Sequence, residues 1–252
     1  MDKNIVTYGL IGHPVGHSFS ASFFNDKFSK EGLVNDFYAA FDIEQISDFP
    51  SFFESQKSLK GFNVTSPWKE EIIQFLDDIM PDARDISAVN CVKIINDSDK
   101  RRLIGYNTDI YGFRESLRCV CDKRADKIST LVLGSGGASR AVKKALEQLG
   151  ITFSSVSRDP RNGLIYGELT PEIIASNKLI INATPLGMGK LAGLAPSIPY
   201  DSIGPDHLCF DLIYNPEETE FLRLCREQGA RTKNGLEMLR LQALKSWEIW
   251  TT

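Results

Sequence analysis

Two side chains that can transfer protons follow short apolar runs in the first half of the chain. Lys69 ends the segment Gly61-Phe62-Asn63-Val64-Thr65-Ser66-Pro67-Trp68-Lys69, and Asp109 ends the segment Asn107-Thr108-Asp109. A glycine-rich segment, Gly134-Ser135-Gly136-Gly137-Ala138-Ser139-Arg140, comes later. A lysine or an aspartate can act as a general acid or base, and a glycine-rich turn suits a dinucleotide that carries a hydride. Together these groups predict the reduction of a ketone.

Each of the two side chains also has a purely structural interpretation. Pro67 suits the first turn of a helix, so Lys69 is predicted to lie in that turn, where a cation opposes the helix dipole. Lys69 could equally be a surface lysine that precedes Glu70 and Glu71. Asp109 could cap the helix that is predicted after it. Spacing alone leaves both alternatives open.

The glycine-rich segment stands in the context that dinucleotide binding requires. The apolar run 131–133 leads into Gly134, which permits a tight turn, and Gly136 lets the backbone approach a pyrophosphate. Ser139 stands where a small residue lets the following helix pack close to the strand. The helix N-terminus offers free N–H groups to phosphate. A strand before the motif and a helix after it favour dinucleotide binding over a merely structural turn.

The end of the next predicted strand, Ser157-Arg158-Asp159, bears on the choice of cofactor. An acidic residue at this position binds the ribose 2′-hydroxyl of NAD, whereas an arginine binds the 2′-phosphate of NADP. Arg158 comes first and its guanidinium suits a phosphate. Asp159 is adjacent, and a solvated Arg-Asp turn is the structural alternative.

Size and composition are those of an ordinary globular protein. The chain has 252 residues, of which 42% are hydrophobic and 25% charged, and a net charge of −4. No Lys/Arg run stands out, so neither nucleic acid nor a membrane surface is predicted as a partner. No apolar run approaches the roughly 18 residues of a membrane span, and the first residues do not form a signal peptide. A cytoplasmic location is expected.

No metal site is expected either. His13 and His17 lie on a Gly/Pro loop without a nearby carboxylate or cysteine partner. Ser18 and Ser20, which follow, could cap the next helix or bind a substrate carboxylate. The cysteines are scattered and complete no zinc site, so reduced thiols are expected; they are Cys91, Cys119, Cys121, Cys209 and Cys225.

Strands and helices are predicted to alternate along most of the chain. Strands are expected at 5–11, 37–41, 61–64, 88–95, 102–106, 128–133, 151–156, 179–182 and 208–213, with a hairpin turn at 96–100. Helices are expected at 20–30, 46–56, 110–117, 138–149 and 236–250. This pattern predicts an α/β protein of two lobes with a cleft between them. The first lobe is an α/β domain, and the second is a doubly wound, Rossmann-type dinucleotide-binding domain.

Taken together, the motifs resemble those of the shikimate dehydrogenase family over essentially the whole chain. The matching segments are 63–69, Ala88-Val89-Asn90, Gly105-Tyr106-Asn107-Thr108-Asp109, 134–140, 181–188, Asp211-Leu212-Ile213-Tyr214-Asn215-Pro216 and 234–242. Their joint occurrence is highly specific, whereas each alone is weak evidence. The resemblance implies that 3-dehydroshikimate is reduced to shikimate with NADPH, on the route through chorismate to the aromatic amino acids.

The resemblance also implies a role for individual residues. Lys69 and Asp109 match the catalytic pair, in which the lysine supplies a proton and the aspartate orients the substrate and the lysine. The substrate contacts implied are Ser18, Ser20, Asn63, Thr65, Asn90, Asp109, Tyr214 and Gln242. The cofactor contacts implied are Gly134, Gly136, Gly137, Ala138, Arg158, Leu212 and Gly235. The family's substrate domain takes back the C-terminal helix, which implies a substrate domain of 1–108 with 236–252 and an NADP-binding domain of 109–235.

Two departures from the family pattern bear on the cofactor. The family usually has a threonine and a further arginine after Arg158, whereas this chain has Asp159-Pro160-Arg161-Asn162-Gly163. The segment before Leu179 is also short, so one crossover helix is expected to be lost or reduced. The strength of the NADP preference therefore stays open.

Three other functions remain as alternatives. An NAD-using quinate/shikimate dehydrogenase shares all these motifs, and a paralogue could act on another hydroxy acid. A non-enzymatic nucleotide-sensing module is the alternative from a different class, and the intact pair of Lys69 and Asp109 argues against it. The sequence does not distinguish a monomer from a homodimer.

Overall fold

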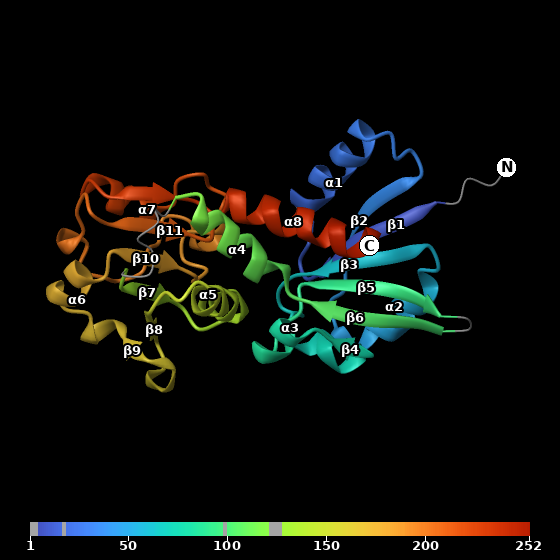
Figure 1. The fold of residues 1–252 in the computed structure, drawn as a ribbon, viewed down its shortest axis with the longest axis horizontal. Coiled ribbons are helices and arrows are strands. Elements are labelled where there is room, and N and C mark those ends of the chain that lie inside the picture. The colour runs from blue at the N-terminus through green and yellow to red at the C-terminus, as the bar shows by residue number, and fades with distance from the viewer. Residues whose placement is uncertain (1–4, 17–18, 98–99, 121–127) are drawn as a thin grey trace. The chain divides into compact units, whose positions relative to one another are not determined.

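The computed structural model of the protein describes residues 5–16, 19–97, 100–120 and 128–252. The chain forms two compact units, 1–108 with 243–252 and 109–242 (Figure 1). The boundary at the C-terminal side falls within one helix, α8 (Leu236–Thr251), between Gln242 and Ala243. The sequence prediction had placed the return of the chain at residue 236.

The first unit is built on a mixed sheet of strand order β2-β1-β3-β5-β6-β4. Strands β1, β2 and β3 are parallel, and β5 and β6 form an antiparallel hairpin that continues the sheet from β3. The short β4 pairs in parallel with β6. The strands are β1 (Val6–Gly12), β2 (Asp36–Asp42), β3 (Leu59–Val64), β4 (Asp78–Ile79), β5 (Cys91–Asp97) and β6 (Lys100–Tyr106).

Two hydrophobic clusters support the strands of this sheet. The helix α1 (Phe19–Lys30) buries Ser20, Phe24 and Phe28, whose spacing of four residues places them on one helix face. This face packs with Tyr38 and the Trp250 end of α8 in one cluster. The second cluster contains Phe62 of β3 and apolar residues of α2 (Phe49–Ser55) and of a 3-10 turn (Glu71–Phe75). A further short helix, α3 (Pro81–Asp85), precedes β5.

The second unit is built on a parallel sheet of strand order β12-β11-β10-β7-β8-β9. Numbered within this unit, the order is 6-5-4-1-2-3, which is the doubly wound Rossmann arrangement. Each of the central strands β7, β10 and β11 is buried along its whole length, as expected for a parallel sheet covered on both faces. The strands are β7 (Thr130–Leu133), β8 (Phe153–Ser157), β9 (Leu164–Ile165), β10 (Leu179–Asn182), β11 (Leu208–Asp211) and β12 (Arg231–Lys233).

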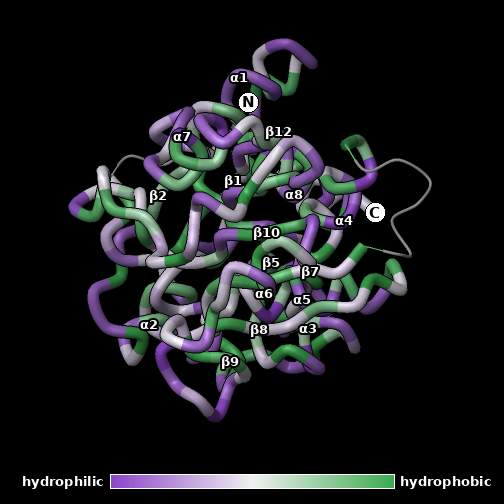
Figure 2. Tube along the Cα trace, turned by 90° about the vertical axis from the view of Figure 1, so that its left-hand side faces the viewer, coloured by the Kyte–Doolittle hydropathy of each residue, from purple (hydrophilic) through white to green (hydrophobic). Residues whose placement is uncertain are grey.

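The helices of the second unit are amphipathic and pack on this sheet. Phe113 of α4 (Thr108–Arg118) stacks on Phe210 of β11 with ring centroids 5.2 Å apart. The helices α5 (Gly137–Gln148) and α7 (Glu220–Glu227) each bury one apolar stripe. The crossover between β8 and β10 contains the two-residue β9, two 3-10 turns of three residues each and the six-residue α6 (Pro171–Ser176), so the expected reduction of this helix is confirmed. Figure 2 shows that hydrophobic and hydrophilic residues are interspersed along the trace.

Most elements follow the predicted pattern, and the fold class is confirmed. The long strands and helices were found because their apolar periodicity is clear. The prediction that Lys69 lies in the first turn of a helix is wrong, because residues 66–70 form a turn and a 3-10 helix begins only at Glu71. The elements that sequence reasoning missed are short, and they are β4, α3, β9, α6, α7 and β12.

Close packing at Gly61 gives a test of this fold. A Cβ atom at Gly61 would lie 2.3 Å from Cδ1 of Trp250, whose indole N–H donates to the Val92 carbonyl over 3.0 Å. Overpacking of this kind costs about 1–3 kcal/mol. We expect Gly61→Ala to lower the free energy of unfolding by that amount in urea titrations.

The matched control is Gly167→Ala, because a Cβ atom there would meet no atom within 4 Å. Its unfolding midpoint should stay close to that of the wild type. Equal stability of the two variants would show that Trp250 does not pack against β3 as described.

Candidate active site

Lys69 lies on a turn that is bound to the segment before β5. The amide N–H of Val89 donates to the carbonyl of Lys69 over 2.8 Å, and the N–H of Val64 donates to the carbonyl of Asn90 over 2.9 Å. The Lys69 side chain is half-buried. Thr65, also half-buried, donates its backbone N–H to the Ile11 carbonyl over 2.9 Å. Three predicted site residues, Lys69, Thr65 and Asn90, are therefore held on neighbouring segments.

Asn63 and Asn90 are buried amides at this end of the sheet, with exposed fractions of 4% and 3%. The Asn63 amide nitrogen donates to the Asn90 carbonyl over 3.0 Å and to the Ser246 hydroxyl over 2.9 Å. The Oδ1 atom of Asn90 accepts from the backbone N–H of Thr108 over 2.6 Å. This bond fixes the residue at which α4 begins.

The predicted residues of the 13–20 loop have different outcomes. His13 Nδ1 lies 2.6 Å from the Asp42 carboxylate, so the prediction that no carboxylate lies near His13 is wrong. Asp42 ends β2, which is distant in sequence, and the loop composition gave no sign of it. Ser20 is buried on α1, on the side that packs with Tyr38. Ser18 and His17 lie outside the described residues.

Asp109 and Gln242 both belong to the second unit, on the helices α4 and α8. Asp109 stands in the first turn of α4 rather than before it, so it is not the N-cap residue. Gly112 follows one helical turn later, and a Cβ atom there would lie 2.6 Å from the Met238 carbonyl and 2.9 Å from Cβ of Gln242. The glycine therefore lets α4 and α8 approach closely. Asp109 and Gln242 are each 8% exposed.

The glycine-rich loop lies between β7 and α5, as predicted. Gly134 has φ of +115°, a conformation that favours glycine, and its carbonyl accepts from the Ser139 hydroxyl over 2.7 Å. Gly136 is the N-cap residue of α5 and is exposed, with open space where a Cβ atom would lie. Gly137 and Ala138 form the first turn of this helix. The loop thus presents helix N–H groups without side chains in front of them, which fits a pyrophosphate.

The loop also lies at the point where the strand order of the sheet reverses. The reversal is between β7 and β10, and a Cβ atom at Gly134 would lie 2.8 Å from the carbonyl oxygen of Ala183, which follows β10. Ligands of open α/β sheets bind outside the carboxyl ends of the strands at such a point. The position of the loop therefore agrees with its composition.

The residues after β8 form a charged turn. Arg158 is exposed and follows β8 directly. The Asp159 carboxylate accepts from the Arg161 guanidinium over 2.6 and 2.9 Å and from the Arg161 backbone N–H over 3.0 Å. These bonds hold the pKa of the Asp159 carboxyl below its usual value. The negative charge of Asp159 is thus paired with Arg161, and Arg158 is exposed beside it.

A buried carboxylate, Asp211, organises the loops after β10 and β11. It is fully buried and accepts from the Thr219 hydroxyl over 2.6 Å, from Asn182 Nδ2 over 3.1 Å and from the Ile213 N–H over 3.0 Å. Burial raises the pKa of this carboxyl. The Asn182 Oδ1 atom accepts in turn from the hydroxyl of Thr184 over 2.7 Å. Sequence reasoning missed this network, although polar residues at the ends of buried strands are a visible signal.

Three more predicted residues lie on these loops. Leu212 donates its N–H to the Asn182 carbonyl over 3.0 Å, and Gly235 donates to the Ile213 carbonyl over 3.0 Å. A Cβ atom at Gly235 would lie only 2.0 Å from the Leu212 carbonyl oxygen, so only glycine fits. Tyr214 is half-buried, and burial raises the pKa of its hydroxyl.

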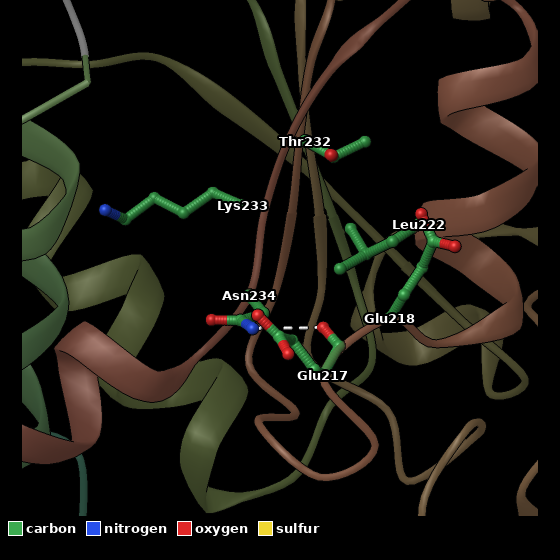
Figure 3. A pocket seen from close by; sticks show the side chains of 6 residues that line it. All are labelled: Glu217, Glu218, Leu222, Thr232, Lys233 and Asn234. Atoms are coloured by element: carbon green, nitrogen blue, oxygen red, sulfur yellow. Dashed lines mark hydrogen bonds between the residues drawn. The ribbon is translucent and has the colours of Figure 1, made fainter.

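A separate hollow of about 450 Å³ lies beside β12 (Figure 3). Asn234 Nδ2 donates to the Glu217 carbonyl across it over 3.0 Å. Lys233 points away from Glu217 and Leu222 in this view and pairs with Glu237. Because the remaining charged side chains of the hollow are Glu217 and Glu218, it does not suit a phosphate.

Among the described residues, no group of three His, Cys, Asp or Glu side chains could hold a metal ion. In the same residues, no helix is both long and apolar enough to cross a bilayer. The cysteines that the structure describes, Cys91, Cys119, Cys209 and Cys225, are free thiols, and Cys121 lies outside the described residues.

Comparison with known proteins identifies the family of this chain. A family model for the shikimate dehydrogenase substrate binding domain matches residues 10–92. The NADP-dependent shikimate dehydrogenase of Methanococcus aeolicus is 40% identical over 259 residues, which covers 96% of this chain and 91% of that protein.

Solved structures of shikimate dehydrogenases also match this chain. Shikimate dehydrogenase from Aquifex aeolicus matches with a TM-score of 0.85 at 36% identity, over 99% of this chain and 94% of that one. Shikimate 5-dehydrogenase from Thermus thermophilus, in complex with NADP(H) and shikimate, matches with a TM-score of 0.86 at 31% identity, over 98% and 94%. With relatives this similar along its whole length, the chain belongs to the family of NADP-dependent shikimate dehydrogenases.

Proposed function

We propose that this protein catalyses the NADPH-dependent reduction of 3-dehydroshikimate to shikimate. The observation that carries the proposal is that one chain, related to this family over its full length, retains Lys69 and Asp109 together with the glycine loop at the switch point of a Rossmann sheet. The reaction belongs to the shikimate pathway. We place it in the cytoplasm and expect a monomer or a homodimer.

In this proposal Lys69 donates the proton to the oxygen that gains negative charge. Asp109 accepts hydrogen bonds from the substrate hydroxyls and from the lysine ammonium, which orients both. Thr65, Asn90, Tyr214 and Gln242 supply further polar contacts to the hydroxyls, and Ser18 and Ser20 bind the carboxylate.

The residues present fit a bound NADP. Gly134, Gly136, Gly137 and Ala138 form the loop and first helical turn that would hold the pyrophosphate, and backbone atoms of Leu212 and Gly235 would contact the nicotinamide end. Arg158 would bind the 2′-phosphate through a charge-assisted contact. When it is bound, the cofactor supplies the hydride.

Two alternatives can be separated from this proposal in one assay. A quinate/shikimate dehydrogenase would use NAD, and a nucleotide-sensing module would bind cofactor without turnover. The absorbance of the reduced nicotinamide, followed with shikimate or quinate and with either cofactor, distinguishes all three. Turnover of shikimate with NADP supports the proposal, and its absence with a folded protein contradicts it.

Replacing Lys69 tests its role as the proton donor. A general acid contributes about 10² to 10⁴ in rate, which is roughly 3–5 kcal/mol of transition-state stabilisation. We expect Lys69→Ala to lose that factor in kcat while its melting temperature and its affinity for NADPH stay near the wild type. The control is Lys57→Ala, since Lys57 is 70% exposed and pairs with the exposed Glu54. A turnover of Lys69→Ala within a few-fold of this control would refute the role.

Replacing Asp109 with asparagine separates chemistry from helix stability. A carboxylate in the first turn of a helix contributes about 0.3–1 kcal/mol through the dipole. Asp109→Asn should therefore change the melting temperature little, whereas kcat should fall by about two to four decades, as for a catalytic group. Steady-state kinetics with shikimate and NADP, measured beside thermal unfolding, test this. If the kinetics were unchanged, Asp109 would have only a structural role.

Replacing Arg158 tests the choice of cofactor. A hydrogen bond to a charged group contributes about 1.5–3 kcal/mol, which is roughly one to two decades of affinity. Arg158→Ala should raise the KM for NADP by that factor and leave the KM for NAD nearly unchanged. Asp159→Thr should shift the ratio toward NADP, because it removes the neighbouring negative charge.

The wild-type ratio is the first measurement of this series. Equal efficiency with NAD and NADP, or an Arg158→Ala ratio equal to that of the wild type, would contradict the NADP assignment. In that case the NAD-using quinate/shikimate alternative would gain support.

A further inference from the structure

A row of buried polar side chains, joined by hydrogen bonds, runs through the first unit at the end of the sheet. The Tyr38 hydroxyl of β2 donates to Asn63 Oδ1 over 2.9 Å, and Asn63 Nδ2 donates to the Ser246 hydroxyl of α8 over 2.9 Å. The Ser246 and Thr108 hydroxyl oxygens lie 3.2 Å apart, and the Thr108 hydroxyl donates to Asn90 Oδ1 over 3.2 Å. These side chains are at most 4% exposed.

The donor is fixed in most bonds of this row. The Tyr38 hydroxyl donates to Asn63, Asn63 donates to Ser246, and the Thr108 hydroxyl donates to Asn90 Oδ1. Between the Ser246 and Thr108 hydroxyls, either group can be the donor. The side chains thus form one connected row from Tyr38 to Asn90. Hydrogen bonds in such a row polarise and strengthen one another.

The Asn63 side-chain amide uses both of its N–H donors within this row of hydrogen bonds. Both hydrogens of its amide nitrogen are donated, one to the Asn90 carbonyl and one to Ser246. A direct N–H contact from Asn63 to a substrate would therefore break a buried bond.

Asn90 is different, because its Oδ1 atom is fixed by the N–H and the hydroxyl of Thr108. This fixes the side-chain plane, and the Nδ2 atom faces the opposite direction. Among the described residues, no hydrogen bond from this Nδ2 atom to the protein is found, so its two hydrogens remain for a ligand.

We propose that Tyr38 and Ser246 are positioning residues for substrate binding, which act through Asn63 and Thr108 on the orientation of the Asn90 amide. Thr108 also begins α4, in which Asp109 is the next residue, so the same row sets the start of the helix that carries this aspartate. The proposal rests on the proposed function, because it needs shikimate as the ligand of Asn90. Nothing in the spacing of Tyr38 or Ser246 marks either residue in the sequence.

The test uses Tyr38→Phe and Ser246→Ala, singly and together. Each variant removes one hydroxyl and almost no apolar volume, and leaves a buried partner without its hydrogen bond. We expect the KM for shikimate to rise about tenfold in each single variant, in line with the usual cost of a buried unpaired group. The KM for NADP should stay within about twofold. The double variant should lose less than the product of the two effects, because both act on one row of bonds.

Tyr8→Phe is the matched control. Tyr8 lies in the same hydrophobic cluster as Tyr38, is 6% exposed and stacks on Trp250 with centroids 5.1 Å apart. In the part of the chain that the structure describes, its hydroxyl forms no hydrogen bond. This variant should keep the wild-type KM for both substrates.

The outcomes separate the two proposals. If the wild type turns over shikimate but both single variants match Tyr8→Phe in the KM for shikimate, the positioning role is wrong and the function stands. If the two KM values rise together in a variant, its role is general folding, and the positioning role is again wrong. If the wild type does not turn over shikimate, the proposed function itself fails. Should Tyr38→Phe not fold, Ser246→Ala decides the matter alone.

Discussion

The constraint on which the rest of this structure depends is that polar side chains at the strand ends are buried and must find their partners within the chain. A buried polar group without a hydrogen bond costs roughly 1–3 kcal/mol. Asn90 in the first unit and Asp211 in the second meet this demand by accepting backbone and hydroxyl hydrogens from other segments. Each thereby fixes a loop or a helix start at one position. Thr108, which Asn90 binds, directly precedes Asp109, and Asp211 binds the loop that contains Leu212 and Tyr214.

Glycine supplies the complementary constraint. At Gly134, Gly112 and Gly235 a side chain would meet backbone atoms of another segment at 2.0–2.8 Å. These glycines bring together loops and helices that the buried polar groups then fix. Segments whose backbones pack so closely exclude water. Their polar groups must therefore form hydrogen bonds within the protein. The N–H groups at the start of α5 remain open toward solvent and can therefore bind a ligand, since Gly136 has free space in front of it.

The fold could be predicted from the sequence where the apolar pattern was long. Strand β7, the Gly134 turn and α5 follow each other with clear periodicity, and the Rossmann order of the sheet agrees with them. The short elements were missed because two to eight residues carry too little periodicity, and α6 and β9 are examples. A helix was predicted at Lys69, where the structure has a turn, because Pro67 fits a turn as well as the first residues of a helix.

The candidate site could be predicted only in part. Lys69 and Asp109 were predicted because their motifs are specific, whereas Tyr38 and Ser246 were not, since one lies in an aromatic strand and the other in an amphipathic helix. Their polar role depends on which segments meet in space. The same holds for His13, whose carboxylate partner Asp42 is 29 residues away. The local composition of the sequence does not indicate which distant residues form such pairs.

The turn after β8 shows how the chain departs from its family without losing the features of a phosphate site. A carboxylate beside a 2′-phosphate would repel it, and Asp159 stands where the family usually has threonine. Here Arg161 binds that carboxylate with both its side chain and its backbone N–H, and Asp159 caps the short 3-10 helix at Pro160–Asn162. Because the pair is largely exposed, its attraction is weakened by solvent, and the residual charge at Asp159 depends on salt. Arg158 is exposed next to this pair. The departure therefore replaces a neutral side chain and a further arginine by a nearly neutral pair, which leaves Arg158 as the guanidinium of this turn that suits a phosphate.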